Sequence, residues 1–189
     1  FVRYLKTLGL PFSEIYVQNM LAKHADVARL IVTLFEARFN PLNPQIGTDI
    51  VDQITRILDT IDSPDEDRVL RRYLNLVLST LRTNYFQHEE NGSHRPCISF
   101  KFDCSAISEM PLPRPMYEIY VYSKDMEAVH LRGGRVARGG IRWSDRFEDY
   151  RTEILGLLKA QTVKNSVIVP VGSKGGFVVK IPTETLSRE

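Results

Sequence analysis

The sequence lacks the features that mark several common classes of protein. It has only two cysteines, Cys97 and Cys104, too few for a disulfide framework, so we expect free thiols in a cytoplasmic protein. No apolar run approaches the ~18 residues that a membrane-spanning helix needs, and nothing at the start reads as a signal peptide. We therefore expect no membrane partner.

Motifs for nucleotides and metals are also missing. Neither G-x-G-x-x-G nor G-x-x-x-x-G-K-[ST] occurs, so the chain has no recognisable dinucleotide site or P-loop. His88 and His94 lie in a polar stretch without periodicity, 87–94. The other two ligands of a zinc site are not evident, so we interpret both as solvated loop histidines and expect no metal site.

The sequence does have the composition of a soluble globular protein, with 43% hydrophobic and 25% charged residues. Its net charge of +2 hides an asymmetry. Residues 1–129 hold 14 Lys and Arg against 17 Asp and Glu, whereas residues 130–180 hold 10 against 4. An anionic small molecule or a nucleic acid is therefore the first class of partner to consider.

The apolar spacing predicts helices in residues 1–92. Ser13 is placed to cap the segment that leads to the first apolar stripe, Val27 to Phe35, and Pro41 and Pro44 should end that helix at Asn40 or before. Thr48 is placed to cap the second helix, whose apolar residues are Ile50, Ile54, Ile57, Leu58 and Ile61. The third begins with Ser63 as cap, Pro64 in the first turn and Glu66 completing a capping box. Its stripe is Leu70, Tyr73, Leu74, Val77, Leu81 and Tyr85.

After residue 92 the pattern changes to short strands. Alternation or β-branched runs predict strands at 98–102, 116–122, 128–131 and 167–169. One helix is expected after Ser144, capped by Asp145 and Glu148. The predicted fold class is α+β or α/β: a helical segment, 1–92, followed by the first part of a mixed-sheet α/β domain, 93–189.

Glycines and cations gather between His130 and Gly176. Two Arg-Gly-Gly triplets, 132–134 and 138–140, are followed by the glycine-rich segment 172–176, which contains Lys174. Cations beside glycine turns can point at an anion, and several together suit a ligand with two carboxylates. Lys174 is the best placed for acid–base or carbonyl chemistry. Trp143 is expected to pack in the core.

Three motifs in this stretch resemble one enzyme family. They are Arg138-Gly139-Gly140-Ile141-Arg142-Trp143, then Lys164-Asn165-Ser166, then Pro170-Val171-Gly172-Ser173-Lys174-Gly175-Gly176. In this order they resemble the start of the catalytic region of the large NAD-dependent glutamate dehydrogenases. They are more distantly similar to the small glutamate dehydrogenases.

The resemblance implies a role for each matching residue. Lys174 matches the catalytic lysine, which assists the attack of water on an iminium intermediate. Lys164 matches a lysine that holds the α-carboxylate of the substrate, and Arg138 falls where small members carry a lysine for the distal carboxylate. The other residues expected to bind substrate or shape the pocket are Gly139, Gly140, Arg142, Gly175 and Gly176.

The implied reaction is the oxidative deamination of L-glutamate to 2-oxoglutarate and ammonia, with a hydride passed to NAD. In the family the NAD-binding domain lies downstream, so we expect an internal fragment that is inactive alone, from a homo-oligomeric parent of amino-acid catabolism. Two alternatives stay open. One is a non-catalytic dicarboxylate-binding or regulatory module, and the other is a basic module that binds RNA through its Arg-Gly-Gly triplets.

Overall fold

The computed structural model describes residues 1–164 and 171–181, and their contacts divide the chain into two compact units. The helical unit comprises Phe1–Thr80 and Ala106–Ser108, and the sheet unit comprises Leu81–Ser105 and Glu109–Glu189. The predicted domain boundary between residues 92 and 93 lies within the sheet unit and stays a prediction.

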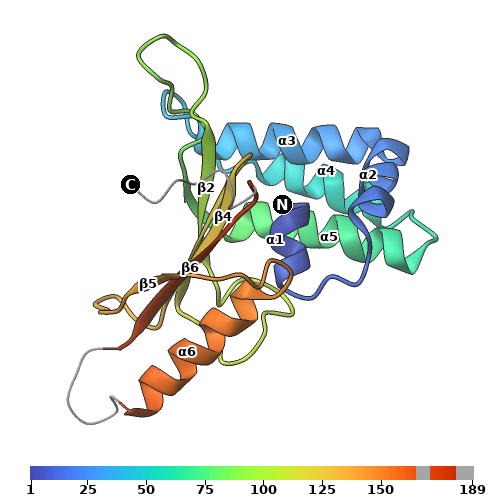
Figure 1. Ribbon diagram of the computed structural model, residues 1–189. Coiled ribbons are helices and arrows are strands. Elements are labelled where there is room, and N and C mark those ends of the chain that lie inside the picture. The colour runs from blue at the N-terminus through green and yellow to red at the C-terminus, as the bar shows by residue number, and fades with distance from the viewer. Residues whose placement is uncertain (165–170, 182–189) are drawn as a thin grey trace. The chain divides into compact units, whose positions relative to one another are not determined.

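Five helices make up the helical unit: α1 (Val2–Thr7), α2 (Glu14–Lys23), α3 (Ala25–Phe39), α4 (Thr48–Leu58) and α5 (Pro64–Ser79). Helices α3, α4 and α5 run side by side (Figure 1). Their shared core consists of side chains from the predicted stripes, among them Val27, Ile31, Leu34, Ile54, Leu58, Leu70 and Val77. The periodicity of the sequence therefore found the buried face of each of these helices.

Several predicted helix ends are confirmed. The Ser13 hydroxyl accepts a hydrogen bond of 3.1 Å from the backbone N–H of Tyr16 at the start of α2. Ser63 is the N-cap of α5, and Pro64 occupies the first turn. Helix α3 ends at Phe39, just before the segment that contains Pro41. These signals are local, so the sequence alone shows them.

Two predicted caps are wrong. Thr48 is the first residue of α4, and the cap is Gly47, which takes a left-handed conformation with φ of +72°. The Glu66 carboxylate does not close a capping box, because it binds Lys23 Nζ and His24 Nε2, each at 2.8 Å. The hydrogen bond from Lys23, followed by that from His24, lowers the pKa of Glu66.

Helix α5 is shorter than its apolar stripe predicts. It ends at Ser79, and Thr80–Thr83 forms strand β1 instead, so the predicted helical positions of Leu81 and Tyr85 are wrong. Thr80 is extended, with ψ of 125°, while its hydroxyl donates to the carbonyl of Leu76 at 2.6 Å. Pairing with the neighbouring strand overrides the helical spacing here.

The sheet unit is built on a six-stranded mixed sheet with the order β1-β2-β3-β4-β6-β5. Its further strands are β2 (Cys97–Asp103), β3 (Tyr117–Ser123), β4 (Met126–Arg132), β5 (Ile141–Trp143) and β6 (Ser173–Val179). Strands β2, β3, β4 and β6 pair antiparallel, and β5 pairs parallel with β6. The α+β fold class with a mixed sheet is confirmed, as are the first three predicted strands. The predicted strand 167–169 lies outside the described residues.

Helix α6 (Tyr150–Lys164) lies along β6 (Figure 1). Its buried side chains include Tyr150, Ile154 and Leu158. The predicted start near Asp145 is wrong, since the helix begins at Tyr150. The chain is still tied to the sheet at Ser144, whose N–H donates to the carbonyl of Phe177 at 2.8 Å.

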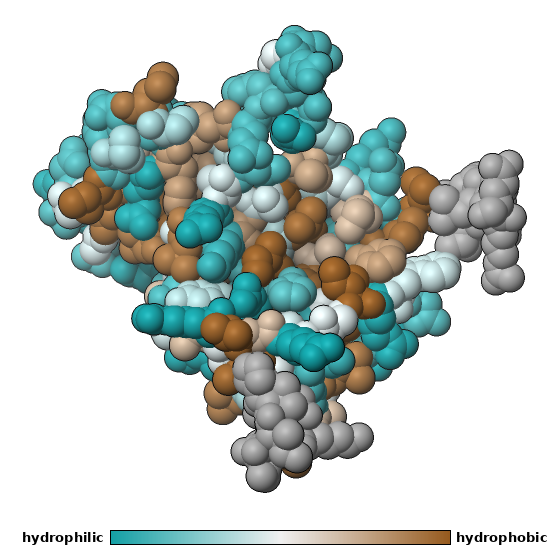
Figure 2. Space-filling model, turned by 90° about the vertical axis from the view of Figure 1, so that its left-hand side faces the viewer, coloured by the Kyte–Doolittle hydropathy of each residue, from teal (hydrophilic) through white to brown (hydrophobic). Residues whose placement is uncertain are grey.

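Some apolar side chains of the sheet unit are exposed. Trp143 is 53% exposed and Ile141 70% exposed, so the prediction that Trp143 packs in the core is wrong. Both belong to β5, an edge strand paired on one side only. Figure 2 shows hydrophobic residues reaching the surface in several places between hydrophilic ones. Within 1–164 and 171–181, no helix has the length and apolar character needed to cross a membrane.

Candidate active site

Two of the three family motifs run side by side in the sheet. The segment Arg138–Trp143 lies parallel to Gly172–Phe177, with a bridge between Arg138 and Gly172 and the register Ile141 to Gly175. The N–H of Ser173 donates to the carbonyl of Arg138 at 3.1 Å, and that of Gly175 to the carbonyl of Gly140 at 2.9 Å. The first and third motifs, which a whole helix separates in the sequence, are therefore adjacent in the sheet and joined by backbone hydrogen bonds.

Gly139 is needed because the two segments approach closely. A Cβ at Gly139 would lie 1.6 Å from the carbonyl oxygen of Ser173, whereas a Cβ at Gly140 would meet nothing within 4 Å. Among the described glycines, positive φ occurs at Gly9, Gly47 and Gly92, and at none of the glycines in the motifs. Steric contact, rather than an unusual backbone conformation, accounts for Gly139.

The glycines of β6 leave room for side chains from neighbouring elements of the sheet unit. A Cβ at Gly176 would lie 2.3 Å from Ile154 Cδ1 of α6, and one at Gly175 would lie 2.8 Å from Ile141 Cγ1. Both glycines are buried. In this structure they admit neighbouring protein side chains, while Gly139 and Gly140 are exposed.

The C-terminal end of α6 reaches the same place. Gln161 Nε2 donates to the carbonyl of Arg138 at 3.0 Å, and a Cβ at Gly172 would lie 2.6 Å from Gln161 Oε1. Lys164 ends the helix less than one turn further along. Its side chain and the neighbouring Asn165 and Ser166 lie outside the described part of the chain. The backbone nevertheless brings Lys164, the first residue of the second motif, close to the other two motifs.

Lys174 lies between these contacts on β6. It is opposite Leu131 of β4, and paired residues of antiparallel strands share a face of the sheet. Gly176, two positions along, points to the same face and contacts α6. Lys174 is half-buried there, and no residue of the described part offers it a hydrogen bond or an ion pair.

The two arginines differ in their surroundings. The side chain of Arg138 is exposed and has no hydrogen-bond or ion-pair partner within the described ranges. Arg142 Nη1 lies 3.2 Å from Glu153 Oε1, and its side chain is 55% exposed. The same carboxylate accepts a hydrogen bond of 2.6 Å from Ser144 Oγ. Sequence reasoning missed Glu153, although its place three residues after Tyr150 puts it on the buried side of α6.

His130 is a titratable group on β4 that lies opposite the glycine segment 172–176. It is half-buried opposite Gly175, where a Cβ on that glycine would lie 3.1 Å from His130 Cδ2. Burial, and after it the charge of Arg132, lowers the pKa of His130. It faces away from the side that Lys174 shares with α6, because neighbouring residues of a strand alternate.

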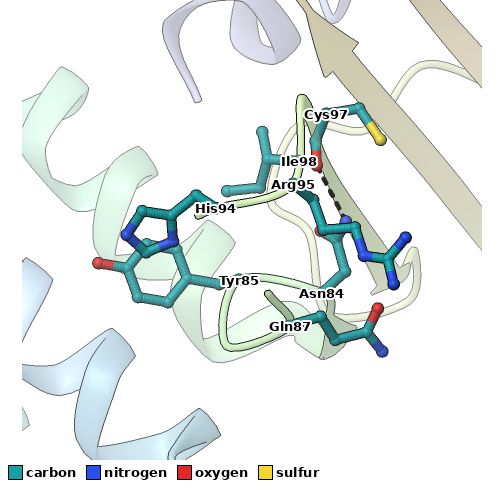
Figure 3. A pocket seen from close by; sticks show the side chains of 7 residues that line it. All are labelled: Asn84, Tyr85, Gln87, His94, Arg95, Cys97 and Ile98. Atoms are coloured by element: carbon teal, nitrogen blue, oxygen red, sulfur yellow. Dashed lines mark hydrogen bonds between the residues drawn. The ribbon is translucent and has the colours of Figure 1, made fainter. Parts of the chain in front are cut away.

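The hairpin 84–97 holds a pocket away from the motifs. A hollow of about 190 Å³ is lined by Asn84, Tyr85, Gln87, His94, Arg95, Cys97 and Ile98 (Figure 3). Asn84 joins both arms of this hairpin, since its Nδ2 donates to the carbonyl of Cys97 at 2.9 Å. His88 and His94 face each other, with ring centroids 4.9 Å apart, and both are exposed. No group of three or more potential metal ligands occurs in residues 1–164 and 171–181.

Comparison with known proteins agrees with the resemblance in the motifs. The family model "Bacterial NAD-glutamate dehydrogenase, catalytic domain" matches residues 53–189, and the model "Glutamate dehydrogenase, helical motif 3" matches residues 1–41. The NAD-specific glutamate dehydrogenase of Halomonas elongata is 50% identical over 100% of this chain, and that of Pseudomonas aeruginosa is 52% identical over 94%. The enzyme of Mycobacterium tuberculosis is 49% identical over 96%.

The chain spans about 12% of the length of these relatives. One family model covers most of the chain, including all three motifs, and the identity to each of the three relatives is about one residue in two. The chain therefore belongs to the bacterial NAD-glutamate dehydrogenase family, as part of its catalytic region.

Proposed function

We propose that this chain carries the substrate-binding part of an NAD-dependent glutamate dehydrogenase. The reaction is the oxidative deamination of L-glutamate to 2-oxoglutarate and ammonia. One observation carries the proposal: the segment 138–141, the glycine segment 172–175 and the end of α6 meet around Lys174, a half-buried lysine without a partner in the described part of the chain.

The residues have distinct roles in this proposal. Lys174 assists the addition of water at the substrate's α-carbon, because a fixed ammonium can hold and transfer a proton there. Lys164 binds the α-carboxylate, as the resemblance implies, and Arg138 binds the distal carboxylate with Arg142 beside it. An exposed guanidinium offers paired donors that match a carboxylate. Gly139 and Gly140 leave the backbone next to Arg138 uncovered.

When NAD is bound, it accepts the hydride. The described residues of this chain do not form a site that fits NAD. The sequence has no dinucleotide fingerprint. Helix α6, the one helix described in the sheet unit, begins next to Asp145, Glu148 and Asp149, whose charges would repel a pyrophosphate at that helix end. We therefore place NAD on another part of the parent protein.

The proposal includes a cytoplasmic, homo-oligomeric parent that acts in amino-acid catabolism. Cys97 and Cys104 are both free, as suits a reducing compartment. The RNA-binding alternative is less favoured, because both Arg-Gly-Gly triplets join the ordered sheet. Gly133 N donates to the carbonyl of Gly172 at 3.0 Å, and the carbonyl of Arg138 accepts from Ser173. RNA-binding boxes of this kind are low-complexity and disordered.

The test uses the full-length parent and the variants Lys174→Ala, Lys164→Ala and Lys159→Ala. We expect Lys174→Ala to lower kcat for NAD reduction with glutamate by roughly 10²–10⁴-fold, the usual contribution of a general acid or base. Lys164→Ala should raise the KM for glutamate. Lys159, exposed on α6, is the matched control and should change neither.

Calorimetry with 2-oxoglutarate separates the alternatives. Binding that is lost in Lys164→Ala, with no NAD reduction by the wild type, would favour a non-catalytic dicarboxylate-binding module. Binding to RNA that weakens steeply with salt, without binding to dicarboxylates, would favour the RNA-binding module. Full activity in Lys174→Ala would overturn the proposed role of that lysine.

A further inference from the structure

Glu153 is a carboxylate that ties α6 to the edge of the sheet. Its Oε2 accepts a hydrogen bond of 2.6 Å from Ser144 Oγ, and its Oε1 lies 3.2 Å from Arg142 Nη1. The Glu153 side chain is 15% exposed, compared with 55% for Arg142. One largely buried acid on the helix therefore binds two side chains: that of Arg142 in β5 and that of Ser144, the residue after β5.

Ser144 gives this carboxylate a fixed position. Ser144 is buried, with 3% exposure, and its N–H donates to the carbonyl of Phe177 on β6 at 2.8 Å. Its hydroxyl also accepts from the N–H of Arg146 at 3.1 Å while it donates to Glu153. Because the serine is fastened to the sheet by its backbone, Glu153 has one preferred place, and its second oxygen is presented to Arg142.

Glu153 binds one edge of the Arg142 guanidinium, and the side chain is otherwise largely exposed. Arg142 pairs with Gly176 of β6, two residues beyond Lys174. Arg142 Nε donates to the carbonyl of Trp143 at 3.4 Å, and Nη1 pairs with Glu153. No described residue accepts from Nη2, whose two N–H donors can meet a further acceptor. A free arginine side chain would lose rotamer entropy when it is ordered on a ligand. Pre-ordering by Glu153 lowers that cost.

We propose that Glu153 is a positioning residue for the substrate. It fixes Arg142 and the edge strand β5 beside Lys174 and the glycine segment, so that Arg142 meets a substrate carboxylate in one orientation. This inference rests on the proposed function, and it assigns to α6 a part in substrate binding beyond that of Lys164.

A purely electrostatic effect of Glu153 and a positioning role predict opposite changes in the KM for glutamate when Glu153 is removed. Glu153 is a carboxylate close to a site for a substrate with net negative charge, so if charge alone mattered its removal would lower the KM for glutamate. If Glu153 positions Arg142, its removal raises that KM. The variant Glu153→Gln separates these effects, because the amide oxygen still accepts from Ser144 Oγ while the ion pair with Arg142 is lost.

The experiment measures steady-state kinetics of the full-length parent with Glu153→Gln. We expect the KM for glutamate to rise about tenfold, a fold-change that corresponds to about 1.4 kcal/mol. The KM for NAD and the melting temperature should stay close to those of the wild type, which a purely structural role would not produce. Glu148→Gln is the matched control, since it removes an exposed charge just before the same helix and should change none of these quantities.

A double-mutant cycle with Ser144→Ala provides the second measurement. Because Ser144 acts on Arg142 only through Glu153, its effect on the KM for glutamate should largely disappear in the Glu153→Gln background. An unchanged or lowered KM for glutamate in Glu153→Gln, or equal increases for glutamate and NAD, would overturn the inference. A wild-type parent that does not oxidise glutamate would instead refute the proposed function.

Discussion

The helical unit and the sheet unit bury their polar groups differently. In the helical unit the ion pair between Arg71 and Asp59 lies at the surface, and the two side chains are 43% and 62% exposed. In the sheet unit the guanidinium of Arg151, 1% exposed, lies 2.6 Å from the carboxylate of Glu118, 0% exposed. If one partner is removed, water can solvate the remaining charge of the exposed pair but not that of the buried pair. The sheet unit should therefore tolerate fewer changes at its polar positions.

The Arg151–Glu118 pair gives the largest expected effect. Arg151 Nε and Nη2 both donate to the Glu118 carboxylate, at 2.8 and 2.6 Å. Arg151→Met leaves this carboxylate buried without its counter-ion, and breaking such a pair costs about 3–5 kcal/mol. We expect that loss in urea unfolding of the 189-residue chain, followed through the fluorescence of Trp143, its single tryptophan.

The double variant Arg151→Met with Glu118→Leu is the control for this pair. Replacing both charges by apolar side chains removes the need to solvate either, so most of the stability should return. Arg71→Met in the helical unit should cost at most about 1 kcal/mol, because exposed ion pairs contribute little. A loss for Arg151→Met no larger than that for Arg71→Met would remove the proposed difference between the units.

The neighbouring glycines of the first motif give an effect of intermediate size. A Cβ at Gly139 would lie 1.6 Å from a backbone oxygen, which no side-chain movement can relieve, whereas Gly140 has open space. Gly139→Ala should destabilise the sheet unit by roughly 2–3 kcal/mol, in the range for overpacking. Gly140→Ala should change its stability by less than about 0.5 kcal/mol.

The same Trp143 fluorescence measures both glycine variants, because Trp143 lies on the strand that Gly139 precedes. Equal stability of the two variants would show that the strands β5 and β6 do not approach as closely as described. The pair is informative since both changes add one methyl group within a single motif.

The contrast between the units also explains what the sequence revealed of the fold. Helices α2 and α5 were predicted with their capping serines, Ser13 and Ser63, and α3 was predicted from its apolar stripe, because each of these signals lies within a few residues of sequence. Strands β5 and β6 were missed, since the glycines in and beside them look like turn residues. Their pairing joins Ile141 with Gly175 across the length of α6, and a sequence pattern does not show which distant segments will pair.

The candidate site was predictable to the extent that its motifs match a family. Lys174 and Arg138 were singled out as cations beside glycines, and the resemblance predicts their roles. The structure brings their segments together. Glu153 was missed because the start of α6 was placed too early, so its position on the buried side went unnoticed. With the start at Tyr150, an acid three residues later beside a buried Ile154 indicates a carboxylate that needs a partner.

The smallest expected effect tests whether the helical unit depends mainly on local interactions. The Ser13 hydroxyl caps α2 through the N–H of Tyr16 at an exposed site. Ser13→Ala should cost about 1 kcal/mol, the usual loss for an N-cap, and should speed amide hydrogen exchange in α2 alone. Ser13→Asp restores an acceptor oxygen and adds a negative charge at the helix N-terminus, so it should restore wild-type exchange. Faster exchange in β2 to β6 of Ser13→Ala would show that the two units unfold together, and the distinction between local and long-range stabilisation would then fail.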